Sequence, residues 1–134
     1  MYIPTKIGIS PTLKIRGIIA IEPINKGSVV ERCPILLFPN KQEEHFMKTI
    51  MKNYYFDWNK KYCCIALGYG SLINHSFHPN VEFTYNYKTK EIIFRALKPI
   101  KEGEELFINY NGESKDQSPV EVALDHDTSA YTIK

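Results

Sequence analysis

One short segment, residues 72–80, concentrates side chains that can bind a ligand, since it reads Leu-Ile-Asn-His-Ser-Phe-His-Pro-Asn. Asn74 supplies an amide and His75 an imidazole, and both groups can donate and accept hydrogen bonds with a heterocyclic ligand. Pro79 and Asn80 set the start of the next strand. Taken alone, the segment favours a turn whose Asn and His side chains satisfy buried backbone groups, with a ligand site as the second interpretation.

A second segment, residues 103–112, predicts a strand that ends at Tyr110, just before an Asn-Gly turn. The phenol of Tyr110 can donate or accept a hydrogen bond, so it could take part in chemistry. A tyrosine in such a place is more commonly a core residue whose hydroxyl reaches water. By itself, this segment therefore indicates little about function.

The cysteine and histidine pattern argues against a metal centre. The three cysteines, Cys33, Cys63 and Cys64, form neither an even disulfide framework nor the spaced Cys/His pairs of a zinc site. His75 and His78 have no third or fourth ligand near them in the sequence. We expect no bound metal, and we expect reduced thiols, as in the cytoplasm.

Length and composition indicate an ordinary globular protein. At 134 residues the chain fits one domain, and 43% of its residues are hydrophobic and 24% charged. The net charge of +2 is too small to indicate a nucleic-acid surface, which disfavours a nucleic-acid-binding barrel. The sequence shows no secretory signal and no apolar run of roughly 18 residues, so we expect an intracellular protein that does not enter a membrane.

The positioning elements are expected to be mainly strands. Short β-branched and aromatic runs alternate with Gly, Pro and Asn clusters, which is typical of a mainly β domain. Polar residues within 84–92 predict a hairpin. The predicted strands cover residues 18–21, 28–33, 35–38, 62–67, 81–87, 92–96 and 107–110.

Two helices are predicted as well. Asn40 followed by Glu43 has the spacing of a capping box, and the apolar residues between 46 and 51 then share one helix face. Near the end of the chain, Pro119 follows Ser118 and predicts a short helix at about residues 119–124. The remaining residues, 125–134, are expected to be a flexible tail.

A pattern of four residues at fixed intervals occurs twice in the sequence. Each copy has alanine, proline, isoleucine and glycine at the same intervals, which describes a strand, a proline-led turn and a glycine that opens the next strand. We interpret the repeat as structural and expect the two units to face each other. The copies are Ala20, Pro23, Ile24 and Gly27, and Ala96, Pro99, Ile100 and Gly103.

Taken together and in this order, these segments resemble the SET family of protein lysine methyltransferases. Residues 72–80 resemble the family's Asn-His-Ser-Cys-x-Pro-Asn signature, and residues 103–110 resemble its Gly-Glu-Glu-Leu-x-x-x-Tyr ending. The two motifs are highly specific as a pair. Residues 15–20 are similar to the opening glycine motif, and residues 24–31 to the lysine-glycine turn and strand that follow. In size, the chain is most similar to the minimal SET proteins of viruses and bacteria.

The resemblance implies a β-clip-like fold of small curved sheets with short helices. The strand that carries Tyr110 would pass beneath the loop at residues 74–80 as a C-terminal pseudoknot, an exception to the general avoidance of threaded chains. Without this threading, Asn74 and Tyr110 could not share one site. The chain would then comprise a SET domain, residues 1–112, and a C-terminal extension, residues 113–134.

The resemblance also implies a reaction, the transfer of a methyl group from S-adenosylmethionine to a lysine of a histone tail or another protein. Tyr110 would be the catalytic residue at the base of the lysine channel. Tyr54 and Tyr69 are the expected aromatic channel residues. The residues expected to bind the cofactor are Arg16, Gly17, Asn74 and His75.

The sequence departs from the family pattern at Phe77, where the family has cysteine, and at Asn109, where it often has aspartate. A zinc-binding Cys-x-Cys run after Tyr110 is missing, so we expect residues 118–124, or a second subunit of a homodimer, to close that side of the site. The departures favour an alternative function, a catalytically degenerate SET fold that binds a ligand or protein. If the chain is viral or a secreted effector, we expect it in the host nucleus.

Overall fold

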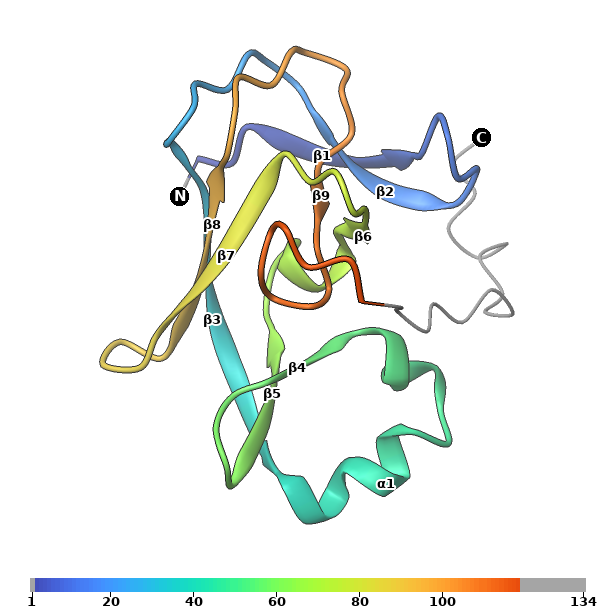
Figure 1. Cartoon of the computed structure of the whole chain (residues 1–134), viewed down its shortest axis with the longest axis vertical. Helices are drawn as coiled ribbons and strands as arrows, with labels where there is room; N and C mark the ends of the chain where they lie inside the picture. The colour runs from blue at the N-terminus through green and yellow to red at the C-terminus, as the bar shows by residue number, and fades with distance from the viewer. Residues whose placement is uncertain (1, 119–134) are drawn as a thin grey trace.

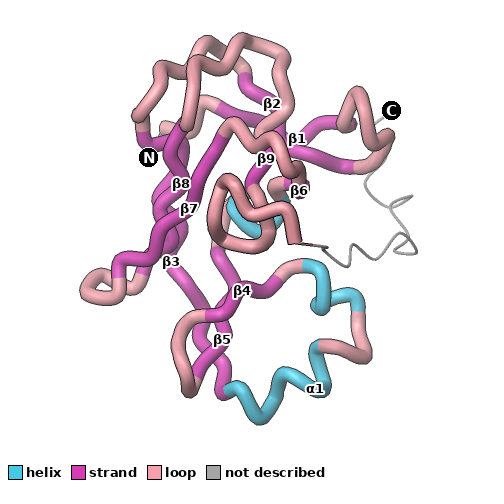
Figure 2. Tube along the Cα trace, in the orientation of Figure 1, coloured by secondary structure: helices cyan, strands magenta, loops and turns pink. Residues whose placement is uncertain are grey.

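The computed structural model describes residues 2–118, which form three small sheets joined by loops and short helical turns (Figures 1 and 2). The predicted mainly β fold is confirmed. The largest sheet has the strand order β4-β5-β3-β8-β7, and the pairs β1-β2 and β6-β9 form the other two. The strands are β1 Thr5–Ile9, β2 Arg16–Ala20, β3 Val29–Pro39, β4 Tyr55–Asp57, β5 Tyr62–Ala66, β6 Asn74–His75, β7 Val81–Asn86, β8 Glu91–Ala96 and β9 Phe107–Ile108.

A single long strand, β3, replaces the two strands predicted at residues 28–33 and 35–38. Pro34 does not interrupt it, because the first half of β3 pairs with β8, the second half pairs with β5, and Pro34 lies where the partner changes. Pro34 has no backbone N–H to donate, but its carbonyl accepts a hydrogen bond from Leu67 N at 2.8 Å. β3 therefore connects the two halves of the sheet.

The helix predicted after Asn40 is broken into short turns, so that prediction was wrong. The Asn40 side chain donates to Lys60 O (2.8 Å) instead of capping a helix. Thr49 has an extended backbone (φ −129°, ψ 172°), which ends one turn, and its hydroxyl accepts from Met51 N (3.1 Å), which starts the next. The segments are a 3-10 turn at Asn40–Gln42, α1 at Glu43–Phe46 and a 3-10 turn at Ile50–Asn53.

Several boundaries differ from the sequence-based expectation. β1 and β4 were not predicted: β1 contains a glycine, which weakens a strand pattern, and β4 has only three residues. The last strand, β9, ends at Ile108 and not at Tyr110. The hairpin predicted within residues 84–92 is formed by β7 and β8. The predicted helix at 119–124 lies outside the described residues.

The repeated spacing brings its two copies together, as expected. Ile24 N donates to Ile100 O (2.8 Å), and Ile100 N donates to Ile24 O (2.9 Å). The two glycines of the repeat have φ values of +83° and +87°, a conformation in which other residues are strained. Two further hydrogen bonds join the two copies, from Gly27 N to Ala96 O and from Gly103 N to Ala20 O, both at 2.8 Å.

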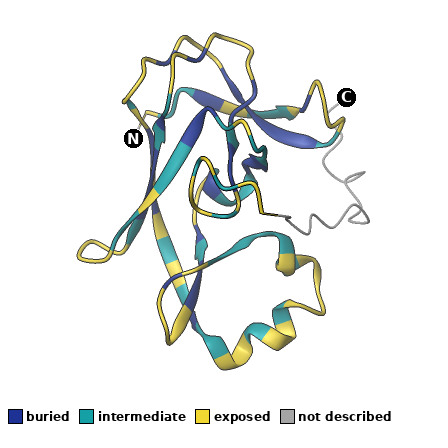
Figure 3. Cartoon of the chain, in the orientation of Figure 1, coloured by how far each residue is buried: buried dark blue, intermediate teal, exposed yellow. Residues whose placement is uncertain are grey.

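The core surrounds β2 and the inner face of the five-stranded sheet (Figure 3). All five residues of β2 are buried, although the strand begins with an arginine. Phe94 of β8 is fully buried, and a Cβ added at Gly70 would lie 2.4 Å from its ring, which explains why a glycine stands there.

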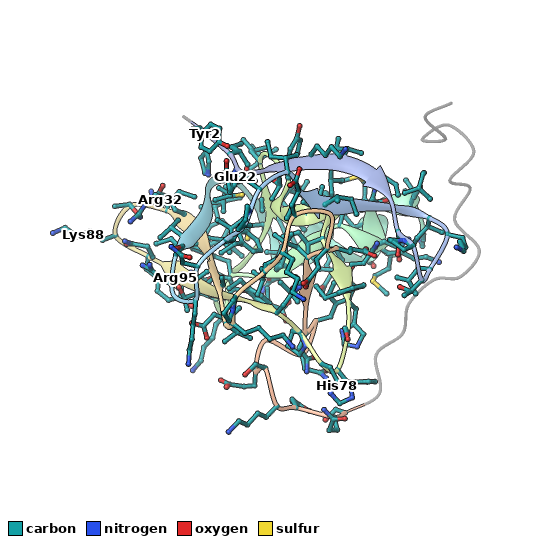
Figure 4. All side chains as sticks on the ribbon, turned by 90° about the horizontal axis from the view of Figure 1, so that it is seen from above. Tyr2, Glu22, Arg32, His78, Lys88 and Arg95 are labelled. Carbon is teal, nitrogen blue, oxygen red and sulfur yellow. The ribbon has the colours of Figure 1, made fainter. Side chains whose placement is uncertain are left out.

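Most charged side chains lie at the surface, with Arg16, Glu31 and Glu105 as buried exceptions. In Figure 4, the labelled Arg32, Lys88 and Arg95 lie on one side of the molecule and His78 lies on another. Across residues 2–118, no helix has the length and apolar character needed to cross a membrane.

Two short strands far apart in the sequence lie side by side. β6 and β9 run parallel, with Asn74 opposite Phe107 and His75 opposite Ile108 (Figure 1). Tyr110 follows β9 by two residues, so this pairing carries it to the loop that contains Asn74. The convergence of these two segments, predicted from the resemblance, is confirmed.

Asn80 connects the loop after β6 to the segment that leads into β9. Its side chain is buried, donates from Nδ2 to Glu105 O (2.9 Å) and accepts at Oδ1 from Phe107 N (2.8 Å). One amide thus satisfies two backbone groups of the segment that leads into β9, as a neighbouring strand would do.

Candidate functional site

A cavity of about 930 Å³ lies beside the β6–β9 pair. Its size falls within the range of about 300–1,000 Å³ that is typical of small-molecule sites. Five of the seven site residues predicted from the sequence line it, namely Arg16, Tyr54, Asn74, His75 and Tyr110. The two that do not are Gly17 and Tyr69.

Tyr110 turns its hydroxyl inward. The hydroxyl donates to Ile73 O at 2.9 Å, although 38% of the residue is exposed at the cavity edge. Burial raises the pKa of Tyr110 to about 12, despite the opposing charge of Arg16. The phenol is therefore neutral near pH 7, and because its proton is donated to Ile73, its oxygen is left as a hydrogen-bond acceptor.

His75 is tied to the same tyrosine. Its Nδ1 accepts a hydrogen bond from Tyr110 N at 3.0 Å, so the neutral ring carries its proton on Nε2. That Nε2 is buried and has no hydrogen-bond partner within residues 2–118. The phenyl ring of Phe77 packs edge-on against the imidazole, with centroids 4.6 Å apart, which gives Phe77 a packing role. His75 thus offers one buried N–H donor to a ligand.

Acid should destabilise the fold through His75. Burial lowers the pKa of His75 from 6.5, so the folded state binds fewer protons than the unfolded state. The contribution of His75 to the free energy of unfolding is therefore fully present above pH 6.5 and is lost as the pH falls through the folded-state pKa. Chemical denaturation of wild type and His75→Gln between roughly pH 5 and 8 measures this loss. We expect it in wild type and in the exposed control His78→Gln, and not in His75→Gln. If the free energy of unfolding changed with pH in the same way in all three proteins, this role of His75 would be contradicted.

Asn74 is fixed by hydrogen bonds to two acceptors. Its Nδ2 donates to Arg16 O (2.9 Å) and to Glu105 Oε2 (2.8 Å). Gly17 makes room for this pair, because an added Cβ would lie 2.4 Å from Glu105 Oε2 and 3.0 Å from Asn74 Nδ2. The packing of polar side chains behind the cavity therefore explains the glycine at position 17, which does not itself line the cavity.

Arg16 and Tyr54 form one wall. The Arg16 guanidinium is buried, donates to Leu72 O and to Tyr54 Oη (3.0 Å), and lies 5.6 Å from the Tyr54 ring centroid. The structure thus brings the positive charge of Arg16 to the cavity.

Tyr69 lies elsewhere. Its ring packs against the core cluster, and its N–H donates to Glu31 Oε2 (3.1 Å). The geometry gives no support to a channel role for Tyr69.

An aromatic wall was missed by the sequence analysis. Phe83, Tyr85 and Tyr87 line the cavity together with Phe56. The Phe56 and Phe83 rings meet edge to face, with centroids 5.2 Å apart. Phe83 and Tyr85 lie in β7 and Tyr87 follows it at the same alternating spacing, so strand periodicity could have indicated that the three side chains share one face.

Asn109 has a structural explanation here. It is buried, donates from Nδ2 to Asp116 O (2.6 Å) and accepts at Oδ1 from Asn111 N (3.0 Å). An aspartate could accept but, when ionised, could not donate to the Asp116 carbonyl. Asn109 thus folds residues 111–118 back, and Asn111, Gly112 and Glu113 of that segment line the cavity.

Asn109→Asp should lower the free energy of unfolding by about 1–3 kcal/mol, because it removes a buried donor and adds a charge beside a carbonyl. Urea denaturation gives the value. Asn25→Asp makes the same charge change at an exposed turn and should cost much less. Equal losses in the two variants would mean that the bond to Asp116 contributes nothing.

Three side chains near one another resemble a metal site, but two of them already have hydrogen-bond partners. The ligand atoms of Glu43, Asp57 and Cys63 lie within 4.8 Å of one another. However, Glu43 accepts from Tyr55 Oη (2.7 Å), and Cys63 Sγ donates to Asn40 Oδ1 (3.1 Å). Burial, then Glu43 and Asp57, raises the pKa of Cys63 to about 11, so it is a thiol. We assign no metal to it.

The residues present suit the expected cofactor. His75 Nε2 and Asn53 Nδ2 are buried donors in the cavity wall without a partner in the described part of the chain. Asn74 adds an acceptor oxygen, and aromatic rings supply apolar faces. A nucleoside-containing ligand with both donors and acceptors would satisfy these groups.

The sequence is similar to known proteins over the segment that builds this site. Residues 15–111, more than half of the chain, match the family model of the SET domain. Over 96 residues, 71% of the chain, it is 37% identical to a histone-lysine N-methyltransferase of Schizosaccharomyces pombe that is specific for H3 lysine 37. The match covers 65% of that relative, less than two thirds of its length.

Two solved structures have similar folds. A Plasmodium falciparum protein assigned as a histone methyltransferase has a TM-score of 0.66 at 29% identity, over 82% of this chain and 95% of that one. A humanized mutant of the Chaetomium thermophilum Polycomb Repressive Complex 2, bound to the inhibitor GSK126, has a TM-score of 0.70 at 24% identity, over 82% of this chain and 15% of that one. The second likeness concerns the fold alone.

Proposed function

Because the chain belongs to the SET-domain family, we propose that it is a protein-lysine methyltransferase that takes its methyl group from S-adenosylmethionine and acts on a histone or another protein. The observation that carries the proposal is the convergence of Tyr110 with the Asn74–His75 pair at one cavity. Two of the similar proteins are described as histone methyltransferases, which makes a histone tail the first substrate to test.

When bound, S-adenosylmethionine supplies an electrophilic methyl group on a sulfonium. The chain must hold the lysine nitrogen in line with that methyl group, at about 3–3.5 Å. Tyr110 suits this task, because its hydroxyl proton is donated to Ile73 O and its oxygen can accept an N–H of the entering amine. That bond would turn the amine lone pair toward the methyl group.

The amine has to be neutral to attack. A lysine side chain has a pKa near 10.4 in water, and a nearby positive charge or a dry channel lowers it. Arg16 places a buried guanidinium in the cavity wall, next to Tyr54. Its charge would favour loss of the lysine proton to solvent before transfer, so no side chain of the site needs to act as a general base.

The alternative, a SET fold that binds without catalysis, drew support from Phe77 and Asn109. Both now have packing or hydrogen-bonding roles that do not interfere with Tyr110. The enzyme is therefore the better supported function.

Two measurements on the wild-type chain test the proposal. Calorimetric titration with S-adenosylmethionine should show binding, and labelled-methyl transfer to histone H3, or to a lysate of the source organism, should show incorporation at lysine. Binding without transfer to any protein would favour the binding module. Absence of binding would exclude both the enzyme and a module that holds this cofactor.

A further inference from the structure

We infer that Glu105 is a positioning residue for the proposed reaction: its buried carboxylate orients the Asn74 amide so that Asn74 Oδ1 faces the ligand. The inference rests on the proposed function. Glu105 lies just before β9, is 6% exposed, and does not line the cavity. It would therefore act through Asn74 and not on the cofactor directly.

The argument starts from hydrogen-bond polarity. The two N–H groups of Asn74 are donated to Arg16 O and Glu105 Oε2, which are both acceptors. The reversed amide would place Asn74 Oδ1 against those same two acceptors, which is repulsive. An ionised carboxylate can only accept, so Glu105 selects one of the two orientations. Asn74 Oδ1 is then the amide atom left for a ligand donor.

The other carboxylate oxygen is held as well. Ser10 is fully buried, and its Oγ donates to Glu105 Oε1. Ser10 also anchors the β1–β2 loop, because Ser10 N donates to Ile15 O (2.7 Å) and Lys14 N donates to Ser10 O (3.0 Å). One carboxylate therefore connects this loop, β6 and the segment before β9.

Two further features indicate that the site is built around this carboxylate. Gly17 lacks the Cβ that would collide with Glu105 Oε2. The charge of Arg16 acts on Glu105 and opposes the effect of burial, which raises the pKa of Glu105. A carboxylate is expensive to bury without partners, so its retention here with Ser10, Asn74 and Arg16 indicates a role beyond packing.

Glutamine at position 105 has nearly the same shape as glutamate, but it replaces one of the two acceptor oxygens with an NH₂ donor. In Glu105→Gln, the new NH₂ group faces either Asn74 Nδ2 or Ser10 Oγ. If it faces Asn74, two donors oppose each other and the Asn74 amide turns over, which presents N–H in place of oxygen to the ligand. We expect the Kd for S-adenosylmethionine to rise at least about tenfold, a difference of about 1.4 kcal/mol.

The experiment compares three purified full-length chains by calorimetry and steady-state kinetics: wild type, Glu105→Gln, and the control Glu104→Gln. Glu104 is the exposed neighbour, so its substitution makes the same charge change without touching Asn74. For Glu105→Gln we expect a raised Kd and KM for S-adenosylmethionine, with an unchanged KM for the protein substrate and a smaller change in kcat at saturation. A purely structural role would affect all of these constants together.

The outcomes separate the inference from the proposed function. Unchanged affinity in both Glu105→Gln and Ser10→Ala, with binding in wild type, overturns the inference and leaves the proposed function standing, whereas absence of binding in wild type overturns both. If Glu105→Gln does not fold, Ser10→Ala provides the comparison, because it removes the donor to the far oxygen. We expect about a threefold rise in Kd from Ser10→Ala, and wild-type affinity in that folded variant overturns the inference.

Discussion

Tyr110→Phe should reduce kcat for methyl transfer by about 10²–10³-fold, the loss that follows removal of one preorganised polar group from a reacting centre. The hydroxyl that is removed lies 2.9 Å from Ile73 O, borders the cavity and is kept neutral by burial. Phenylalanine keeps the ring and its contact with His75, whose centroid lies 5.1 Å away. The affinity for S-adenosylmethionine should therefore change little.

Labelled-methyl transfer at saturating cofactor and protein substrate measures this effect, and calorimetry measures the binding. Tyr62→Phe is the matched control: Tyr62 is exposed on β5 and does not line the cavity, so removal of its hydroxyl should leave both quantities at the wild-type level. Wild-type kcat in Tyr110→Phe would remove this hydroxyl from the mechanism. A lost affinity for S-adenosylmethionine would instead mean that the hydroxyl shapes the cofactor site.

Asn80→Ala should produce the largest loss of stability, about 2–6 kcal/mol, because it leaves two backbone groups without their partner and each costs about 1–3 kcal/mol. The groups are Glu105 O and Phe107 N, at 2.9 and 2.8 Å from the Asn80 amide. A typical domain has a total stability of about 5–15 kcal/mol, so the variant should be close to unfolding at elevated temperature.

Urea denaturation followed by circular dichroism gives the difference. Asn86→Ala is the control, since Asn86 Oδ1 also accepts two backbone bonds, from Lys88 N and Thr89 N, but in an exposed hairpin turn where water can replace them. A loss below about 1 kcal/mol for Asn80→Ala, equal to that of Asn86→Ala, would show that β9 is held by its pairing with β6 alone. A variant that is stable but cannot bind S-adenosylmethionine would show that Asn80 shapes the site without supporting the fold.

Sequence patterns determined the features that depend on neighbouring residues. Polar residues between two strand patterns predicted the β7–β8 hairpin, and the repeated Pro and Gly spacing predicted the paired turns at Ile24 and Ile100. These features could be read because a strand or turn is specified by residues close together in the chain. The paired motifs at residues 72–80 and 103–110 indicated the family by resemblance, whereas their composition alone favoured an ordinary turn and a core tyrosine.

Local patterns failed where a distant partner overrode them. The capping-box spacing at Asn40 predicted one helix, but the Asn40 amide donates to Lys60 O instead of capping, and the extended backbone of Thr49 separates the segment into short turns. Pro34 was taken as a strand boundary, but it lies inside β3 because the two halves of that strand have different partners. In both cases a contact made by another part of the chain outweighed the local preference.

The composition of the site was decided by the tertiary structure. Tyr54 and Tyr69 were both predicted to line the channel, yet only Tyr54 lines the cavity, because the Tyr69 ring packs against the core. In the sequence, Glu105 is only one residue of the motif at residues 103–110. The fold places its carboxylate between Ser10 and Asn74. The sequence by itself determines the types of side chain and their local backbone preferences. Which distant segments come into contact depends on packing and hydrogen bonding summed over the whole chain.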